Sequence, residues 1–387
     1  STLGRDGAAW SASSDQDWLE VTASGGTGGA LTLTANPLLL AADTLHVAQV
    51  SIASDDPLIE NTQGIRVGLW IGSADPGVIA LPDGIERTVM DPVAPWLYAH
   101  SGADLVSVYN VYTGELVTSY AAGTSAPGGM AASSDGLKLF VADTATGQAF
   151  ELSAADGTPV QTYTPPFQTA NADLAYARPD ALPTLLFGNT YAADAATGEF
   201  FEAQLGGSGT IAVAADQRVV FLHNTGTSPS TATRQELRRT VLDGGALRVE
   251  NRADFFPGSN GQDAALAPDG ARFYAASGGY YAFPVYDGVT REFIEDLAGA
   301  AYPNNAEVAW NGVFAGGASA YYDAVDLWFY DAAGAVLGTE RCFGSSYSWL
   351  VRDSIRFSGD ALRYACSAGP DVWGEGATLR IRDVPGS

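Results

Sequence analysis

A turn residue that recurs at nearly even spacing limits the possible folds of this chain more than any other feature. From about residue 85 onward, an Asp or Asn follows a short apolar segment seven times. These residues are Asp91, Asp135, Asp180, Asp216, Asp269, Asn311 and Asp360. Their spacings are 44, 45, 36, 53, 42 and 49 residues, with a mean of about 45. A unit of this length is shorter than a typical domain and indicates a structural repeat.

Each repeat has the pattern of four short strands. Residues 263–270 predict a strand and its turn, and residues 272–277, 280–286 and 291–297 predict three more strands. Residues 129–163 follow the same plan. A four-stranded unit that repeats at roughly 40–50 residues is typical of a β-propeller, in which neighbouring blades cover both faces of each sheet. Seven turn residues therefore predict seven blades.

The last repeat is one strand short. It supplies strands near residues 354–357, 362–366 and 378–383, and then the chain stops. The segment Gly77–Leu81 precedes the first full repeat and has no place in it. We expect this segment to become the outer strand of the last blade, which would close the propeller. The alternative is that residues 77–81 are a simple linker.

Residues 1–75 do not fit the repeat and predict a separate small β-sandwich. Short runs of Val, Ile, Tyr, Phe and Thr occur throughout the chain, and no stretch has sustained helical spacing of apolar residues. The expected class is all-β. Asp75-Pro76-Gly77 predicts the boundary between a domain of residues 1–75 and a second domain of residues 76–387.

The residues around two tryptophans carry a resemblance to a known family. The segment Trp10–Thr22 reads WSASSDQDWLEVT and is followed by Ser24-Gly25-Gly26. It resembles the start of a BACON-type immunoglobulin-like domain, which implies a Ser-Gly turn at this point. Later strands are expected at residues 31–34, 46–53 and 64–71. Such domains usually open with one or two strands before the first tryptophan, and only nine residues precede Trp10. A first strand would then come from upstream sequence or from elsewhere.

The second domain is similar to YVTN-type and quinoprotein-like propellers. This resemblance rests on repeat units such as Ala265–Gly270 and on no catalytic motif. It implies an architecture that serves enzymes, scaffolds and adhesins alike. The BACON resemblance implies an accessory domain in a secreted or surface protein, with carbohydrate or mucin binding.

The charge of the chain excludes some classes of function. Nineteen Lys and Arg residues against 44 Asp and Glu residues give a formal charge of −25 at pH 7. This excludes nucleic-acid binding through phosphate neutralisation and any polybasic contact with a membrane. No apolar run is long enough for a membrane span, so we expect no membrane insertion.

The two cysteines, Cys342 and Cys366, fall in the last two repeats. A disulfide between them would hold the closing blade and stabilise the fold by roughly 3 kcal/mol on the chain-entropy model. The alternative is a pair of buried free thiols. The disulfide and the surface-type architecture predict an extracellular or cell-surface location.

No motif indicates a metal, a cofactor or a catalytic group. The pairs Asp15/Asp17, Asp55/Asp56 and Asp323/Asp326 could each hold calcium, but a solvated acidic surface is the favoured interpretation. His46, His100 and His223 have no local partner carboxylate or nucleophile, so we assign them structural or loop positions. We expect no metal site, no cofactor and no catalytic residue.

Aromatic residues in the predicted loops are the candidate binding residues. The loops that join second to third strands and fourth to first strands emerge on one face of a propeller. Those loops contain Tyr280, Tyr281, Tyr321, Tyr322, Tyr347, Trp349 and Trp373. Exposed aromatic rings can stack on sugars or anchor a protein partner. The alternative is that these rings pack between blades.

These observations favour a secreted or cell-surface protein that recognises a glycan, a matrix, a protein or another copy of itself, without catalysis. A first alternative is a subunit of an extracellular filament or array, in which the incomplete sandwich accepts a strand from a neighbour. A second is a propeller hydrolase, lactonase or lyase, which would need His, Arg and carboxylates converging from the inner strands. The inner strands at 211–214 and 264–267 read IAVA and AALA, which argues against an enzyme.

Overall fold

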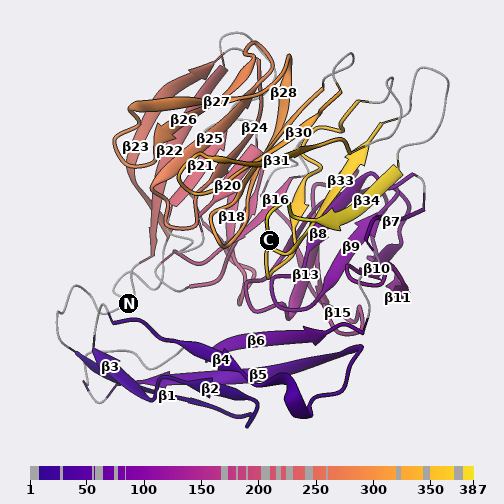
Figure 1. Cartoon of the computed structure of the whole chain (residues 1–387), viewed down its shortest axis with the longest axis vertical. Coiled ribbons are helices and arrows are strands. Elements are labelled where there is room, and N and C mark those ends of the chain that lie inside the picture. Colours follow the sequence, from indigo (N-terminus) through magenta and orange to yellow (C-terminus); the bar gives the residue numbers. More distant parts are fainter. Residues whose placement is uncertain are drawn as a thin grey trace. The chain divides into compact units, whose positions relative to one another are not determined.

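The computed structural model shows an all-β chain that divides into two compact units. The N-terminal unit comprises residues 1–75 with 93–95, and the C-terminal unit comprises residues 76–92 with 96–387. The structure describes residues 8–26, 29–54, 56, 64–73, 77–82, 84–166, 173–179, 182–188, 191–201, 210–214, 219–223, 230–239, 247–258, 260–319, 324–342, 349–369 and 378–387. Each unit is described separately below (Figure 1).

Two antiparallel sheets make up the described part of the N-terminal unit. The larger sheet has the strand order β3-β1-β5-β6, and the smaller one pairs β2 with β4. The strands are β1 (Ala9–Ser14), β2 (Leu19–Val21), β3 (Ser24–Gly26), β4 (Leu33–Ala35), β5 (Thr44–Ala53) and β6 (Gly64–Ile71), and the short 3-10 helix η1 spans Pro37–Leu39. Trp18, Leu19, Ala48 and Val50 form the buried core of this unit.

The expected Ser-Gly turn is wrong, because Ser24–Gly26 forms the edge strand β3 and pairs with β1. Gly25 lies opposite Trp10 in this pairing, and a Cβ at Gly25 would clash with the Trp10 indole. The indole Nε1 donates a hydrogen bond of 2.9 Å to the carbonyl of Gly26. Glycine is therefore required here by the close approach of a tryptophan ring.

Seven separate four-stranded antiparallel sheets make up the described part of the C-terminal unit. Six of them run consecutively along the chain. The first sheet consists of β8 (Arg87–Met90), β9 (Trp96–His100), β10 (Val106–Asn110) and β11 (Leu116–Tyr120), and the second of β12 (Pro127–Ala132), β13 (Lys138–Asp143), β14 (Ala149–Ser153) and β15 (Pro159–Tyr163). The third sheet consists of β16 (Leu174–Ala177), β17 (Thr184–Phe187), β18 (Tyr191–Asp194) and β19 (Phe200–Phe201), and the fourth of β20 (Thr210–Val213), β21 (Val219–His223), β22 (Ser230–Arg239) and β23 (Leu247–Gly258). The fifth sheet consists of β24 (Gly261–Leu266), β25 (Arg272–Ser277), β26 (Ala282–Asp287) and β27 (Phe293–Ala298), and the sixth of β28 (Pro303–Val308), β29 (Phe314–Ala318), β30 (Leu327–Tyr330) and β31 (Val336–Glu340).

The seventh sheet joins the two ends of this unit. Its strands β32 (Arg356–Phe357), β33 (Arg363–Ala368) and β34 (Thr378–Asp383) are completed by β7 (Ile79–Ala80). Ile79 lies opposite Ile381 and Ala80 opposite Arg380. The predicted pairing of residues 77–81 as the outer strand of the last sheet is therefore confirmed.

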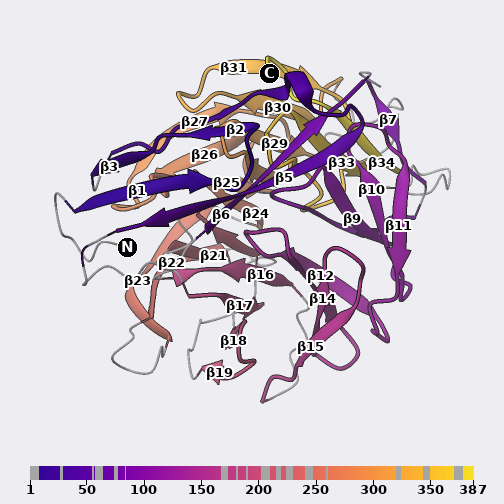
Figure 2. The same ribbon diagram turned by 90° about the horizontal axis from the view of Figure 1, so that it is seen from below.

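The first strands of the seven sheets contact one another in sequence order. The contacts run from β8 through β12, β16, β20, β24 and β28 to β32, and β32 contacts β8 again. Fourth strands such as β15, β19 and β23 lie at the periphery of the unit (Figure 2). We call the central set the ring of first strands.

Hydrophobic clusters fill the spaces between successive sheets. One cluster joins Tyr98 and Val108 of the first sheet to Leu139 and Val141 of the second. Another joins Phe283 of the fifth sheet to Phe314 of the sixth, with their ring centroids 5.6 Å apart. The cluster of Ile79, Leu379 and Ile381 with Met90 and Leu97 connects the last sheet to the first. Each sheet thus buries apolar side chains against both neighbours.

The recurring turn residues do what turn chemistry predicts. In four of them, the side chain accepts a hydrogen bond of 2.9–3.1 Å from the backbone N–H two residues further along the chain. These four are Asp135, Asp269, Asn311 and Asp360. Asp91 differs, because it accepts from the buried Tyr98 hydroxyl at 2.8 Å. Asp180 and Asp216 lie outside the described residues. Asp at these turns is explained by local hydrogen bonding alone.

Polar contacts reinforce the junction between the last and first sheets. Arg363 is buried and its guanidinium forms an ion pair with Asp383, donates to the carbonyl of Gly77 at 2.8 Å and lies 6.0 Å from the centroid of the Tyr112 ring. The Tyr112 hydroxyl in turn donates to Asp360. These contacts join the sequence before β8 to the end of the chain.

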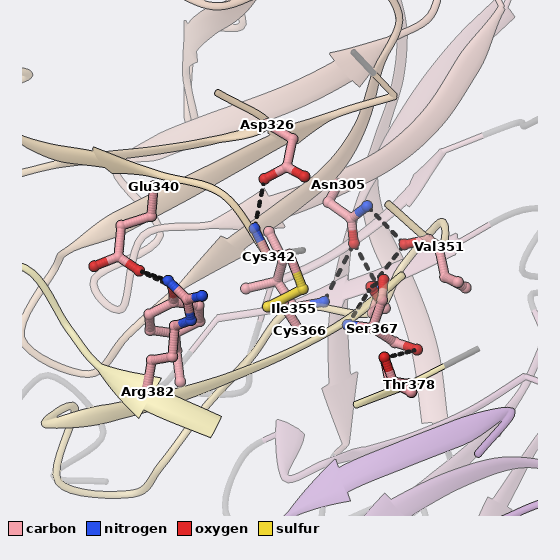
Figure 3. The surroundings of a disulfide bond; sticks show 12 residues. Asn305, Asp326, Glu340, Cys342, Val351, Ile355, Cys366, Ser367, Thr378 and Arg382 are labelled. Carbon is pink, nitrogen blue, oxygen red and sulfur yellow. Dashed lines mark hydrogen bonds and ion pairs between the residues drawn. A yellow bond between two sulfur atoms is a disulfide. The ribbon is translucent and has the colours of Figure 1, made fainter. Parts of the chain in front are cut away.

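The predicted disulfide between Cys342 and Cys366 is present (Figure 3). Cys342 follows β31 of the sixth sheet, and Cys366 lies within β33 of the seventh, with 6.0 Å between their Cα atoms. The backbone N–H of Cys342 donates to Asp326 at 2.8 Å, and burial is the main reason that the pKa of this carboxyl rises to about 6. The bond links the two sheets nearest the end of the chain.

The closing strand leads to the first prediction. Replacing Ile79 by Ala removes a side chain that is 8% exposed and packs between the last and first sheets. We expect Ile79→Ala to lower the free energy of unfolding by about 2–3 kcal/mol, measured by urea denaturation. The control is Val78→Ala, because Val78 is 56% exposed next to it. Equal effects of the two substitutions would contradict a closing role for β7.

Candidate functional site

The ring of first strands surrounds a central cavity of about 360 Å³. Residues from all seven first strands line it. Small apolar residues form part of the wall, as the sequence predicted, with Ala131, Ala175, Ala212 and Ala264 among them. This volume lies within the range of small-molecule sites, roughly 300–1,000 Å³.

Charged side chains also converge on this cavity. They are Arg87, Asp91, Asp173, Asp263, Glu307, Asp353 and Arg356, and Asp91 is engaged by the Tyr98 hydroxyl. The small apolar inner strands argued against such convergence in the sequence, but the structure places these charges around the cavity. The charges come from first strands or from within three residues of one, and each of five sheets supplies one or two of them. In the sequence they are isolated residues of different repeats, and only the ring brings them together.

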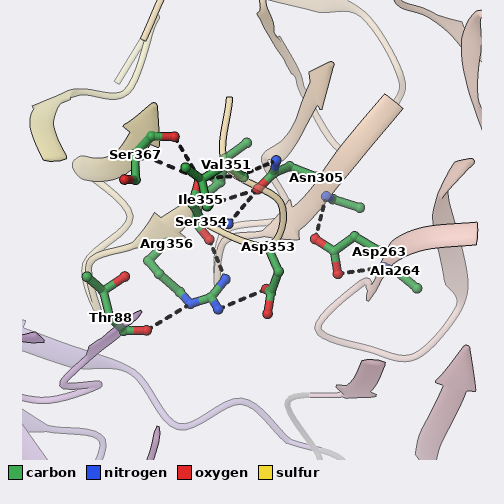
Figure 4. Close-up of polar contacts among 11 residues, drawn as sticks. Thr88, Asp263, Ala264, Asn305, Val351, Asp353, Ser354, Ile355, Arg356 and Ser367 are labelled. Carbon is green, nitrogen blue, oxygen red and sulfur yellow. Dashed lines mark hydrogen bonds and ion pairs between the residues drawn. The ribbon is translucent and has the colours of Figure 1, made fainter. Parts of the chain in front are cut away.

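Arg356 occupies the start of β32 and is fully engaged by the protein (Figure 4). Its Nη2 lies 2.8 Å from Oδ1 of Asp353, its Nη1 donates to the Ile355 carbonyl at 2.7 Å, and its Nε donates to the Thr88 carbonyl at 3.4 Å. Burial alone would lower the pKa of Arg356, but Asp353 and the carboxyls of Glu307 and Asp263 raise it overall. The guanidinium stays charged and fixed.

Asp353 is held by the turn that precedes β32. Its φ angle is +52°, a left-handed conformation that Asp tolerates better than most residues. Asn305, which is fully buried on β28, accepts from the N–H groups of Ser354 at 2.6 Å and Ile355 at 3.2 Å and donates to the Val351 carbonyl at 2.9 Å. One buried amide thus fixes the turn that carries the Asp353–Arg356 pair.

Asp263 bridges the first strands of the fifth and sixth sheets. Oδ1 accepts from the N–H of Ala264 at 2.8 Å, and Oδ2 accepts from the N–H of Ala306 at 2.9 Å (Figure 4). Burial raises the pKa of this carboxyl well above its usual value, the nearby Asp353 adds to the rise, and these hydrogen bonds oppose it. Both oxygens of Asp263 therefore serve the packing of β24 against β28.

Glu307 and Asp173 also have raised pKa values. Burial is the largest cause for both, and the Asp353 carboxylate adds to it. The pKa of Glu307 reaches about 7, despite the opposing charge of Arg356. Arg87 opposes the rise for Asp173. Glu307 therefore exchanges its proton near neutral pH, in a cavity large enough for a ligand.

Three of the seven candidate aromatic residues lie in the described part of the chain, and all three are exposed. Tyr280 is 38% exposed, Tyr281 73% and Trp349 43%. The other four, Tyr321, Tyr322, Tyr347 and Trp373, lie outside the described residues. The sequence argument did not select Tyr302, which is 58% exposed on the loop between β27 and β28. Its position between a fourth and a first strand could have identified it.

His100 has a structural role. It is 2% exposed at the end of β9, its Nδ1 accepts from the N–H of Gly102 at 3.2 Å, and its Nε2 donates to the Gly128 carbonyl at 2.7 Å. Burial lowers the pKa of this ring, so it stays neutral at pH 7. His46 in β5 contacts the Ala41 carbonyl at 3.0 Å, and the side chain of His223 lies outside the described part.

Comparisons with known proteins add no relative. No protein-family model matches the chain, and no curated protein matches it in sequence. Within the described residues, no three His, Cys, Asp or Glu side chains come together in a way that could hold a metal ion. The described residues also include no helix that is long and apolar enough to cross a membrane.

The raised pKa of Glu307 leads to the second prediction. The pKa of Glu307 is about 7 in the folded protein, whereas an unburied glutamate has a pKa of 4.5. The folded protein therefore binds this proton more tightly than the unfolded chain. Stability then falls as pH rises from 4.5 to 7 and levels off above 7. We expect Glu307→Gln to match the wild type near pH 4 and to be more stable at pH 8, by up to about 3 kcal/mol. Urea denaturation at both pH values measures this difference.

The matched control is Glu292→Gln, because Glu292 is exposed before β27. It should show no difference from the wild type that depends on pH. A stability difference between Glu307→Gln and the wild type that stays constant from pH 4 to pH 8 would contradict the raised pKa.

Proposed function

We propose that residues 76–387 form a seven-bladed β-propeller and that the protein is a secreted or cell-surface recognition protein that binds glycan chains without catalysis. The seven four-stranded sheets, with first strands that contact in sequence order from β8 to β32 and back to β8, support the propeller. The disulfide supports secretion, because such bonds persist in oxidising compartments. We also propose that residues 1–75 form an immunoglobulin-like sandwich.

The observation that carries the glycan proposal is a set of exposed aromatic rings at one end of the sheets. Tyr281 lies between a second and a third strand, and Tyr302 and Trp349 each precede a first strand. In antiparallel four-stranded sheets these loops all lie at the end where first strands begin. Flat rings exposed on one face can stack on sugars. The net charge of −25 repels acidic polymers, which favours neutral glycans.

The third prediction tests this face. We expect Tyr281→Ala and Trp349→Ala each to weaken binding to a neutral polysaccharide by about tenfold or more, the loss typical of an aromatic anchor. Affinity electrophoresis in gels that contain a panel of neutral soluble polysaccharides measures the retardation. The control is Phe293→Ala, because Phe293 is 55% exposed on the outer strand β27.

Two results would overturn this proposal. The first is a failure to bind: either no polysaccharide retards the wild type, or Phe293→Ala and the loop variants are retarded equally. The other is turnover: hydrolysis of a lactone panel by the wild type, lost in Glu307→Gln, would replace recognition by the enzyme alternative.

A second candidate function, assembly of copies by strand addition, has one specific observation in its favour. The smaller sheet of the N-terminal unit has two strands in the described residues, β2 and β4. All three residues of β4 are exposed, Leu33 among them. An exposed strand edge is a template for pairing with another chain.

The fourth prediction concerns this assembly. If copies associate through β4, the wild type forms particles much larger than 40.1 kDa in light scattering and filaments or arrays in electron microscopy. Leu33→Lys should then return it to a monomer, because a charge on an edge strand blocks pairing. Leu116→Lys, at an exposed position on β11, is the control and should still assemble. A wild-type monomer of 40.1 kDa would exclude obligatory assembly.

A further inference from the structure

We propose that the central cavity binds an organic cation, a primary ammonium group on a compact apolar body, through the carboxyl of Glu307, with Asp173 as a second carboxyl in the same cavity. This site is distinct from the exposed aromatic loops and does not rest on glycan binding.

Most of the charges in the cavity are already engaged by the protein. All three nitrogens of Arg356 have partners, and one of them is the Asp353 carboxylate. Both oxygens of Asp263 accept backbone N–H groups. By contrast, the side chains of Glu307, Asp173 and Arg87 make no hydrogen bond or ion pair with any residue that the structure describes. Two of these three groups are carboxyls, so the charges that remain for a ligand are predominantly acidic.

The walls determine what kind of cation fits. Apolar side chains from several first strands line the cavity, among them Met130, Leu174, Ile211 and Val308, together with the Tyr176 ring. A hydrated metal ion would leave such walls in contact with water, whereas an amine with an apolar body would cover them. An aromatic ring in the wall adds an attraction for an organic cation.

The free carboxyls are poised to respond to a positive ligand. Burial disfavours the charged form of Glu307 and Asp173, and Asp353 repels it further. The groups that act on them or face them are Arg87 on β8, Tyr176 on β16, Asp263 on β24, and Arg352, Asp353 and Arg356 at or just before β32. A bound ammonium adds a positive charge to that of Arg356 and favours the ionised form of Glu307 further, so binding releases protons and weakens as pH falls.

The fifth prediction uses phenethylammonium as the probe in isothermal titration calorimetry on the full chain. We expect the wild type to bind it at pH 8 and Glu307→Gln to bind it about tenfold more weakly or worse, as for the loss of a charged hydrogen-bond partner. Glu292→Gln is the matched control and should bind like the wild type. The neutral analogue N-acetylphenethylamine should not bind.

A second measurement needs no variant and keeps the proposal testable if Glu307→Gln fails to fold. At pH 7, titrations of the wild type in buffers of different ionisation enthalpy should show net proton release, and the affinity should fall between pH 8 and pH 5. Absence of amine binding, equal binding of the neutral analogue, or binding without proton release would each overturn the proposal. Calcium binding that excludes the amine and is lost in Glu307→Gln would overturn it in favour of a metal site.

Two variants distinguish the glycan proposal from the cation proposal, so that either can be rejected without the other. Tyr281→Ala should leave phenethylammonium binding unchanged, and Glu307→Gln should leave polysaccharide retardation unchanged. Loss of both kinds of binding in either variant would contradict two separate sites.

Discussion

The need to cover both faces of every sheet in the C-terminal unit underlies the rest of its structure. A four-stranded sheet with apolar side chains on both faces is stable only between two neighbours, and a row of such sheets leaves two faces uncovered unless the last meets the first. The cluster around Ile79, Leu97 and Ile381 meets this need. Pairing of β7 with β34 and the buried guanidinium of Arg363 act at the same junction.

The central cavity is a consequence of that arrangement. The first strands of the seven sheets contact one another in sequence order, and the space left between them is lined by the side chains that point into it. Here those include an arginine held by Asp353 and two backbone carbonyls, and carboxyls whose pKa values are raised by burial. The proposed cation site rests on this difference. Arg356 and Asp263 are held by protein partners, whereas Glu307 has no partner among the described residues.

The predictions from the sequence were correct for features that depend on residues close together in the chain. The Asx-type turns at Asp135 and Asp360 depend on a side chain and an N–H two residues away, so their spacing could be read directly. Strand alternation and the strand missing from the last repeat predicted the pairing of residues 77–81. The Ser-Gly segment was wrongly assigned as a turn, because what decides its conformation is the Trp10 ring packed over Gly25.

The sequence by itself determined the all-β class, the four-stranded repeat, the closing strand and the two cysteines that could form a disulfide, because each depends on short-range pattern or on a count. Only the tertiary structure decided the candidate cavity. Glu307, Asp173 and Arg356 lie in three different repeats and have no motif in common. Their proximity and the raised pKa of Glu307 arise from burial at the centre of the ring, and burial is a property of the assembled sheets rather than of any segment.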